Sequence, residues 1–94
     1  MKSRLISRNI KINGRRTSMR LEEATWEAID EICVFEDVSL HVLCSAIDEC
    51  RDNSSRTSAV RAFIITYFHK FAAECGGLTS GRAEDMLPGL SMTG

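Results

Sequence analysis

The chain has 94 residues, of which 44% are hydrophobic and 27% are charged, a length and composition that indicate one globular domain and exclude a disordered chain. The formal net charge of -1 conceals a strong segregation. Residues 1–20 contain seven Lys or Arg residues and no acid, a local charge of +7, whereas the remainder sums to -8. A basic end on an acidic body suits a polyanionic partner, although a solvated basic tail would have the same composition.

The first fourteen residues are open to two interpretations. Residues 9–12 alternate in polarity like a short strand, and the Asn13-Gly14 dipeptide is a strong signal for a tight hairpin turn. This segment could therefore fold back on residues 15–18. It could instead form an extended basic arm over residues 1–14, and we favour the arm.

A strand is predicted from about residue 15 to residue 21, because polar and apolar side chains alternate there. One face carries Arg16, Ser18 and Arg20, and the other carries Thr17, Met19 and Leu21. A strand must pair its backbone groups, and no nearby run is an obvious partner of the same length and pattern. The simplest partner is a second copy of the protein, which predicts a homodimer with an intermolecular antiparallel ribbon. A two-stranded ribbon fits the major groove of B-DNA.

Helical periodicity predicts three helices after the strand, at about residues 23–36, 40–51 and 57–74. Ser39 is placed to cap the second helix, because serine at this position accepts a hydrogen bond from the first turn. The glycines that follow residue 75 end the third helix, and residues 76–94 are predicted to be a flexible tail.

A basic alternating strand, a helix, a short turn and a serine-capped helix are the parts of a ribbon-helix-helix domain. Residues 15–51 resemble such a domain of the Arc and methionine repressor superfamily, and residues 8–71 resemble a bacterial subfamily that has a third helix. The resemblance is carried by the run from Asn9 to Glu22, by Trp26, by Ser39-Leu40 and by Ile47-Asp48. It implies a mainly α fold with one short β-strand, an intertwined homodimer with an intermolecular two-stranded antiparallel ribbon, and a third helix.

The resemblance also implies a sequence-specific DNA-binding transcriptional regulator, a repressor, on the cytoplasmic nucleoid. Base edges of double-stranded DNA would be read by Arg16, Ser18 and Arg20. Contacts to the DNA backbone would come from the basic arm and from the start of the second helix, namely Lys2, Arg4, Arg8, Lys11, Arg15, Ser39 and Leu40. The core shared between the subunits would contain Thr17, Met19, Leu21, Trp26, Ile29, Ile32, Leu43 and Ile47. Dimers could pair further on DNA.

The alternative function is an antitoxin-type interaction module of the same fold, which would bind a protein partner through residues 76–94. The four cysteines and two histidines lack the paired spacing of a structural zinc site, and no glycine-rich phosphate loop is present. We therefore expect no metal, no cofactor and no enzymatic activity. No stretch resembles a membrane span or a secretory signal, which predicts a cytoplasmic protein with reduced cysteines and no membrane partner.

Overall fold

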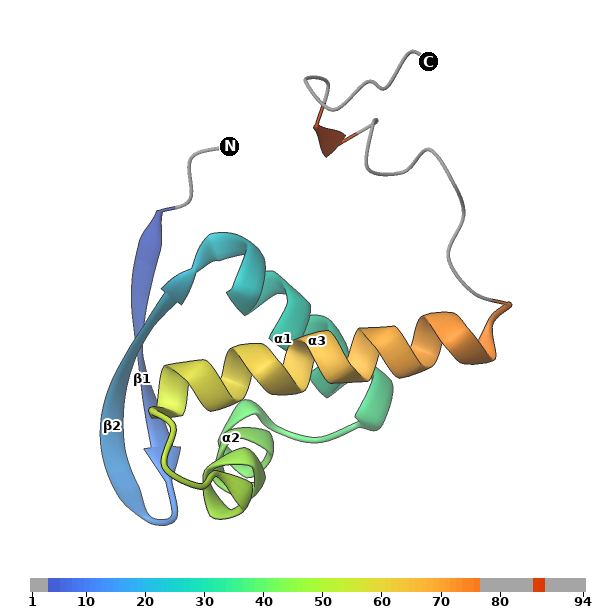
Figure 1. Ribbon diagram of the computed structural model, residues 1–94. Coiled ribbons are helices and arrows are strands. Elements are labelled where there is room, and N and C mark those ends of the chain that lie inside the picture. The colour runs from blue at the N-terminus through green and yellow to red at the C-terminus, as the bar shows by residue number, and fades with distance from the viewer. Residues whose placement is uncertain (1–3, 77–85, 88–94) are drawn as a thin grey trace.

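The computed structural model describes residues 4–76, 86 and 87, and it shows a two-stranded ribbon followed by three helices (Figure 1). The elements are β1 (Leu5–Ile12), β2 (Arg15–Glu22), α1 (Glu23–Glu36), α2 (Leu40–Cys50) and α3 (Arg56–Glu74). This confirms the mainly helical ribbon-helix-helix architecture, and each helix lies within one residue of its predicted range. The predicted tail falls almost entirely outside the described residues.

The ribbon is a hairpin within one chain, which corrects the argument that the strand after Gly14 lacks a partner in its own chain. β1 pairs antiparallel with β2 in a register that runs from Leu5 opposite Glu22 to Ile12 opposite Arg15. Residues 5–12 are therefore an eight-residue strand rather than part of an extended arm, and the described residues form two strands where the sequence predicts one. Asn13 and Gly14 form the hairpin turn that the sequence offers as the alternative to the arm. Both residues adopt positive φ, 51° and 83°, as a two-residue hairpin turn requires.

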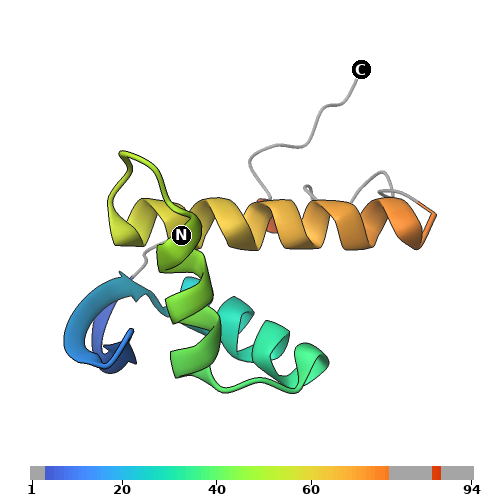
Figure 2. The ribbon, with the colours of Figure 1, turned by 90° about the horizontal axis from the view of Figure 1, so that it is seen from below.

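The helices cover one face of the ribbon and leave its other face to solvent (Figures 1 and 2). α1 ends at Glu36, and its C-cap residue Asp37 adopts a left-handed φ of 54°. Ser39 caps α2 as predicted, since its Oγ accepts a hydrogen bond from the Val42 N–H at 3.1 Å. Ser55 caps α3 in the same way, through the Ser58 N–H at 3.2 Å. Within the described part of the chain, no helix is long and apolar enough to cross a membrane.

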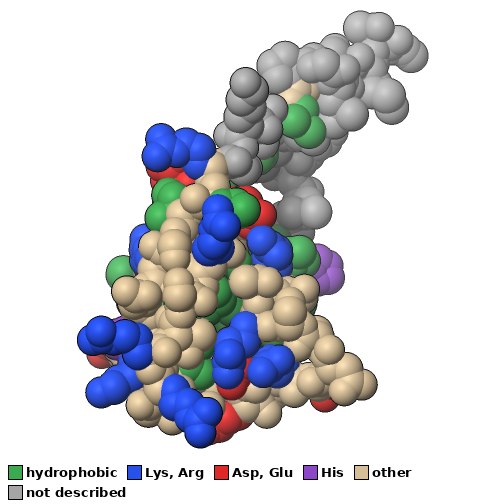
Figure 3. Space-filling view, turned by 90° about the vertical axis from the view of Figure 1, so that its left-hand side faces the viewer, with side chains coloured by type: hydrophobic (Ala, Val, Ile, Leu, Met, Phe, Trp, Pro, Cys, Tyr) green, Lys and Arg blue, Asp and Glu red, His purple; other side chains and the backbone are tan. Residues whose placement is uncertain are grey.

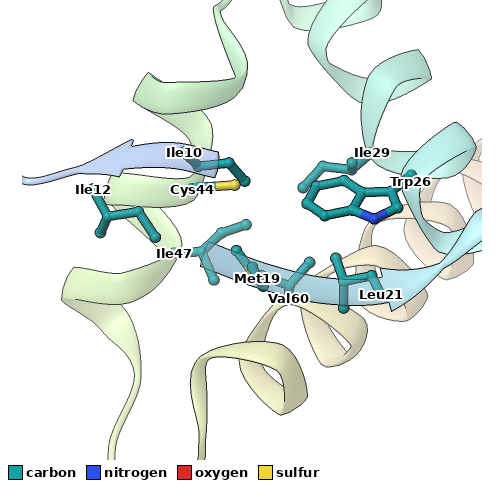
Figure 4. Packing of buried hydrophobic residues seen from close by; sticks show 9 residues of the cluster. All are labelled: Ile10, Ile12, Met19, Leu21, Trp26, Ile29, Cys44, Ile47 and Val60. Atoms are coloured by element: carbon teal, nitrogen blue, oxygen red, sulfur yellow. The ribbon is translucent and has the colours of Figure 1, made fainter. Parts of the chain in front are cut away.

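The hydrophobic core lies between the ribbon and all three helices (Figure 4). Its side chains are at most 8% exposed, and they belong to Ile10, Ile12, Met19, Leu21, Trp26, Ile29, Cys44, Ile47 and Val60. Ile32 is also buried, Leu43 packs at the margin and Thr17 is half-buried. Most of the residues predicted for a core shared between subunits are thus already buried within one chain, where β1 and α3 also contribute to the core.

An ion pair ties α3 to the end of β2. The Arg61 guanidinium donates from Nε to Glu22 Oε1 at 3.1 Å and from Nη2 to Glu22 Oε2 at 2.9 Å. Thr25 Oγ1 donates to the same carboxylate at 3.0 Å. The hydrogen bond from Arg61 is the main reason why the pKa of Glu22 lies below its ordinary value of 4.5.

This ion pair predicts a specific acid sensitivity. Because the folded-state pKa of Glu22 is lowered, its carboxylate stabilises the fold above pH 4.5, and that contribution is lost as pH falls through the folded-state pKa. In urea unfolding at about pH 6 and about pH 3, the midpoint of the wild-type protein should fall more than that of Glu22→Gln. An equal fall in both proteins would show that the Glu22–Arg61 pair does not stabilise the fold.

Candidate nucleic-acid interface

The solvent-exposed face of the ribbon is polar and basic. The register places Lys11 opposite Arg16, Asn9 opposite Ser18 and Ser7 opposite Arg20. We call these six exposed residues the ribbon face: Ser7, Asn9, Lys11, Arg16, Ser18 and Arg20. It contains no acidic residue, and Figure 3 shows Lys and Arg side chains distributed around this side of the molecule. The arrangement offers hydrogen-bond donors and positive charge to a polyanion.

The predicted base-contacting residues Arg16, Ser18 and Arg20 are all exposed on this face. Two members of the face, Ser7 and Asn9, are absent from the sequence prediction, because that prediction favours an extended arm over residues 1–14. The sequence did contain a usable signal, since a two-residue turn fixes the register of a hairpin and hence the cross-strand partners. Ser7 lies close to the centre of the face, where its Oγ is 2.9 Å from Ser18 Oγ.

The two edges of the ribbon differ. The end of the β1 edge next to the turn is covered by α2, since the Lys11 N–H donates to His41 Nδ1 at 2.9 Å and the Asn13 N–H donates to Ser45 Oγ at 3.0 Å. Backbone groups of an antiparallel pair alternate between the partner strand and the outer edge. Since the Lys11 N–H points outward, the pairs on the ribbon face are the ones whose backbone groups point away from the partner strand.

The N–H and C=O groups of Arg16, Ser18 and Arg20 therefore point away from β1, along what we call the β2 edge. Within residues 4–76, no hydrogen bond reaches these groups. An unpaired edge of this kind is a template for another strand. The ribbon thus has one edge that α2 covers near the turn and one edge that is open to a partner.

The start of α2 lies beside the covered edge of the ribbon. The first N–H groups of α2, on Leu40 and His41, precede the capped Val42 N–H and have no partner within the helix. Ser39 is exposed and Leu40 is half-buried against the core. Because His41 Nδ1 accepts a hydrogen bond, the imidazole in this arrangement carries its proton on Nε2. The helix end therefore presents N–H donors and a partial positive charge.

Arg8 differs from the other described basic residues near the N-terminus, because its half-buried guanidinium is paired with other residues of the chain. Its Nη1 and Nη2 donate to Asp30 Oδ1 and Oδ2, each at 3.1 Å, and its guanidinium carbon lies 4.5 Å from the centre of the Trp26 ring. These contacts give Arg8 a structural role, and we leave it out of the interface. Arg4, Lys11 and Arg15 are exposed, whereas Lys2 lies outside the described residues.

Two acidic residues, Glu36 and Asp37, precede α2, and one of them contacts α3. Glu36 Oε2 accepts a hydrogen bond from the Tyr67 hydroxyl at 2.6 Å, which directs the carboxylate toward α3. This hydrogen bond also raises the pKa of Tyr67. Asp37, the C-cap residue of α1, remains exposed.

The cysteines show no metal site. Among the described residues, no three His, Cys, Asp or Glu side chains gather closely enough to hold a metal ion. Cys44 lies in the core, where burial raises the pKa of its thiol to about 11, so that the thiol is protonated at neutral pH. All four cysteines are free thiols.

Comparison with known proteins agrees with this architecture. The model of the family described as ribbon-helix-helix domain matches residues 5–68, a range that begins with β1 and extends into α3. No curated protein and no solved structure matches the chain.

Proposed function

The chain belongs to the ribbon-helix-helix family, and we propose that it is a sequence-specific transcriptional repressor that acts as a homodimer. Members of the family are generally DNA-binding regulators that bind DNA as dimers. The observation that carries the proposal is the open β2 edge, whose outward-facing residues are also the basic and polar residues of the ribbon face.

A second copy completes the open edge. Two β2 strands that pair antiparallel across a two-fold axis satisfy the outward backbone groups of Arg16, Ser18 and Arg20 in both copies. The same pairing places six side chains, three from each copy, on one continuous face. A single chain buries its own core, so this pairing adds an interface to a chain that is already folded.

The chemistry of the face suits DNA. Arginine at positions 16 and 20 can donate two hydrogen bonds to guanine O6 and N7, and Ser18 can donate or accept. The N-terminus of α2, at Ser39 and Leu40, is suited to a backbone phosphate, because its free N–H groups and helix dipole favour an anion. Arg4, Lys11 and Arg15 supply positive charge to further phosphates, and Lys2 is proposed from the sequence to do the same.

Replacement of Arg20 by alanine tests base reading. We expect Arg20→Ala to lose about 1–3 kcal/mol of discrimination between a duplex that the wild-type protein selects from a random DNA library and a shuffled duplex. Fluorescence anisotropy titrations with both duplexes measure this difference. The control Arg15→Ala, which removes an exposed charge outside the ribbon face, should weaken binding to both duplexes by the same factor. Equal weakening by Arg20→Ala would exclude Arg20 from base reading.

A further inference from the structure

β1 adds a second row of outward side chains to the ribbon, beside the row on β2. Ser7, Asn9 and Lys11 are exposed on this row. Ser7 is hydrogen-bonded to Ser18, and Lys11 carries a charge. The side-chain amide of Asn9 has no hydrogen-bond partner within residues 4–76, so its two N–H donors and its acceptor are available to a ligand.

The order of strands in the dimer follows from the two edges. α2 covers the edge of β1 next to the turn, where His41 Nδ1 lies 2.9 Å from the Lys11 N of β1 and Ser45 Oγ lies 3.0 Å from the Asn13 N of the turn. In the proposed dimer the second copy adds its strand at the β2 edge, which α2 does not contact. The dimer, which this inference takes from the proposed function, thus contains a four-stranded sheet with the two β2 strands in the middle and a β1 strand on each side.

The width of such a sheet decides where each strand meets DNA. Neighbouring strands lie about 4.8 Å apart, so the two β1 strands are separated by roughly 14 Å. The major groove is about 12 Å wide. The two β2 strands fit between the walls of the groove, whereas the β1 strands lie at the walls, where the sugar–phosphate backbones run.

We propose that Asn9 on each outer strand contacts a phosphate at the wall of the major groove, so that it contributes affinity without base preference. Its amide N–H donors suit a phosphate oxygen, and Lys11 supplies positive charge on the same row. The start of α2 lies on the same side, because His41 is hydrogen-bonded to the Lys11 backbone at 2.9 Å. The competing arrangement has one hairpin entering the groove alone, in which Asn9 would bond adenine at N6 and N7 and determine sequence.

Two substitutions of Asn9 in the full chain separate these arrangements. Each variant is titrated with the duplex that the wild-type protein selects from a random library and with its shuffled counterpart, and each is also taken through the selection itself. We expect Asn9→Ala to lose about tenfold in affinity on both duplexes and to select the same sequence as wild type. Asn9→Asp, which places a negative charge beside the phosphate, should lose more on both. The matched control is Asn53→Ala, which changes an exposed asparagine outside the ribbon and should leave binding unchanged.

The outcomes discriminate between this inference and the proposed function. Selection of a different sequence by Asn9→Ala, or a shift toward cytosine with Asn9→Asp, would place Asn9 on the bases and overturn the inference while the proposed function stands. Wild-type affinity in both variants would also overturn the inference alone. A wild-type protein that selects no sequence would overturn the proposed function and this inference with it. Circular dichroism and sedimentation of each variant establish that it remains a folded dimer.

Discussion

Ser18→Pro is expected to give a folded monomer that no longer binds DNA specifically. The Ser18 N–H points away from β1, so proline at this position removes no backbone hydrogen bond of the hairpin, although it loses the hydroxyl contact with Ser7. It does remove a donor from the middle of the β2 edge and places a ring where the second copy would pair. We expect light scattering to report a monomer, and affinity for the selected duplex to fall by about 100-fold or more, because each monomer retains only half of the contacts.

The control for this substitution is Ser18→Ala, which loses the hydroxyl but keeps the backbone N–H. It should remain a dimer by light scattering and should retain most of its DNA affinity. A dimer formed by Ser18→Pro at the concentrations at which the wild-type protein dimerises would show that the subunits associate through another surface. Loss of the dimer in both variants would show that the hydroxyl, rather than the strand edge, is required.

Trp26→Ala is expected to have the largest effect on stability. The indole is 1% exposed, its Nε1 donates to the Ile6 carbonyl at 2.8 Å, and the Arg8 guanidinium lies over its ring. Alanine removes the packing of α1 against the ribbon, leaves a cavity and takes away the support of the Arg8–Asp30 ion pair. We expect the free energy of unfolding to fall by about 3–5 kcal/mol in urea denaturation followed by far-ultraviolet circular dichroism.

The neighbouring exposed residue provides the control. Glu27→Ala should change the free energy of unfolding by less than about 0.5 kcal/mol, because Glu27 lies outside the core. Similar losses in Trp26→Ala and Glu27→Ala would contradict the assignment of Trp26 as the residue that joins α1 to the ribbon.

The helices were predictable because their apolar residues repeat at helical spacing and serines precede α2 and α3. For β1 the sequence indicates a possible strand only at residues 9–12, and the extended arm is favoured over it. Arg8 occupies an inward position between Ile6 and Ile10, where a strand pattern normally shows an apolar residue. Its charge is accommodated there by Asp30 and by the ring of Trp26. A sequence pattern cannot show that an arginine has such partners twenty residues away.

The candidate site was predictable only where it depends on local alternation. The period of two on residues 15–21 correctly placed Arg16, Ser18 and Arg20 on one exposed face. Asn9 and Ser7 joined that face only through the pairing of β1 with β2. Arg8 could not be separated from the interfacial basic residues by charge alone, because local composition does not indicate which arginine is paired inside the fold.

Residue-resolved hydrogen exchange of the wild-type dimer, bound to the duplex that it selects, tests the central claim most directly. The backbone N–H groups of Arg16, Ser18 and Arg20 have no partner within residues 4–76, and the account assigns their partners to the β2 strand of a second copy. The account predicts that all three amides exchange slowly, both in the free dimer and on DNA. Rapid exchange of these amides in a DNA-bound dimer would show that the β2 edges remain unpaired and that the two copies meet elsewhere.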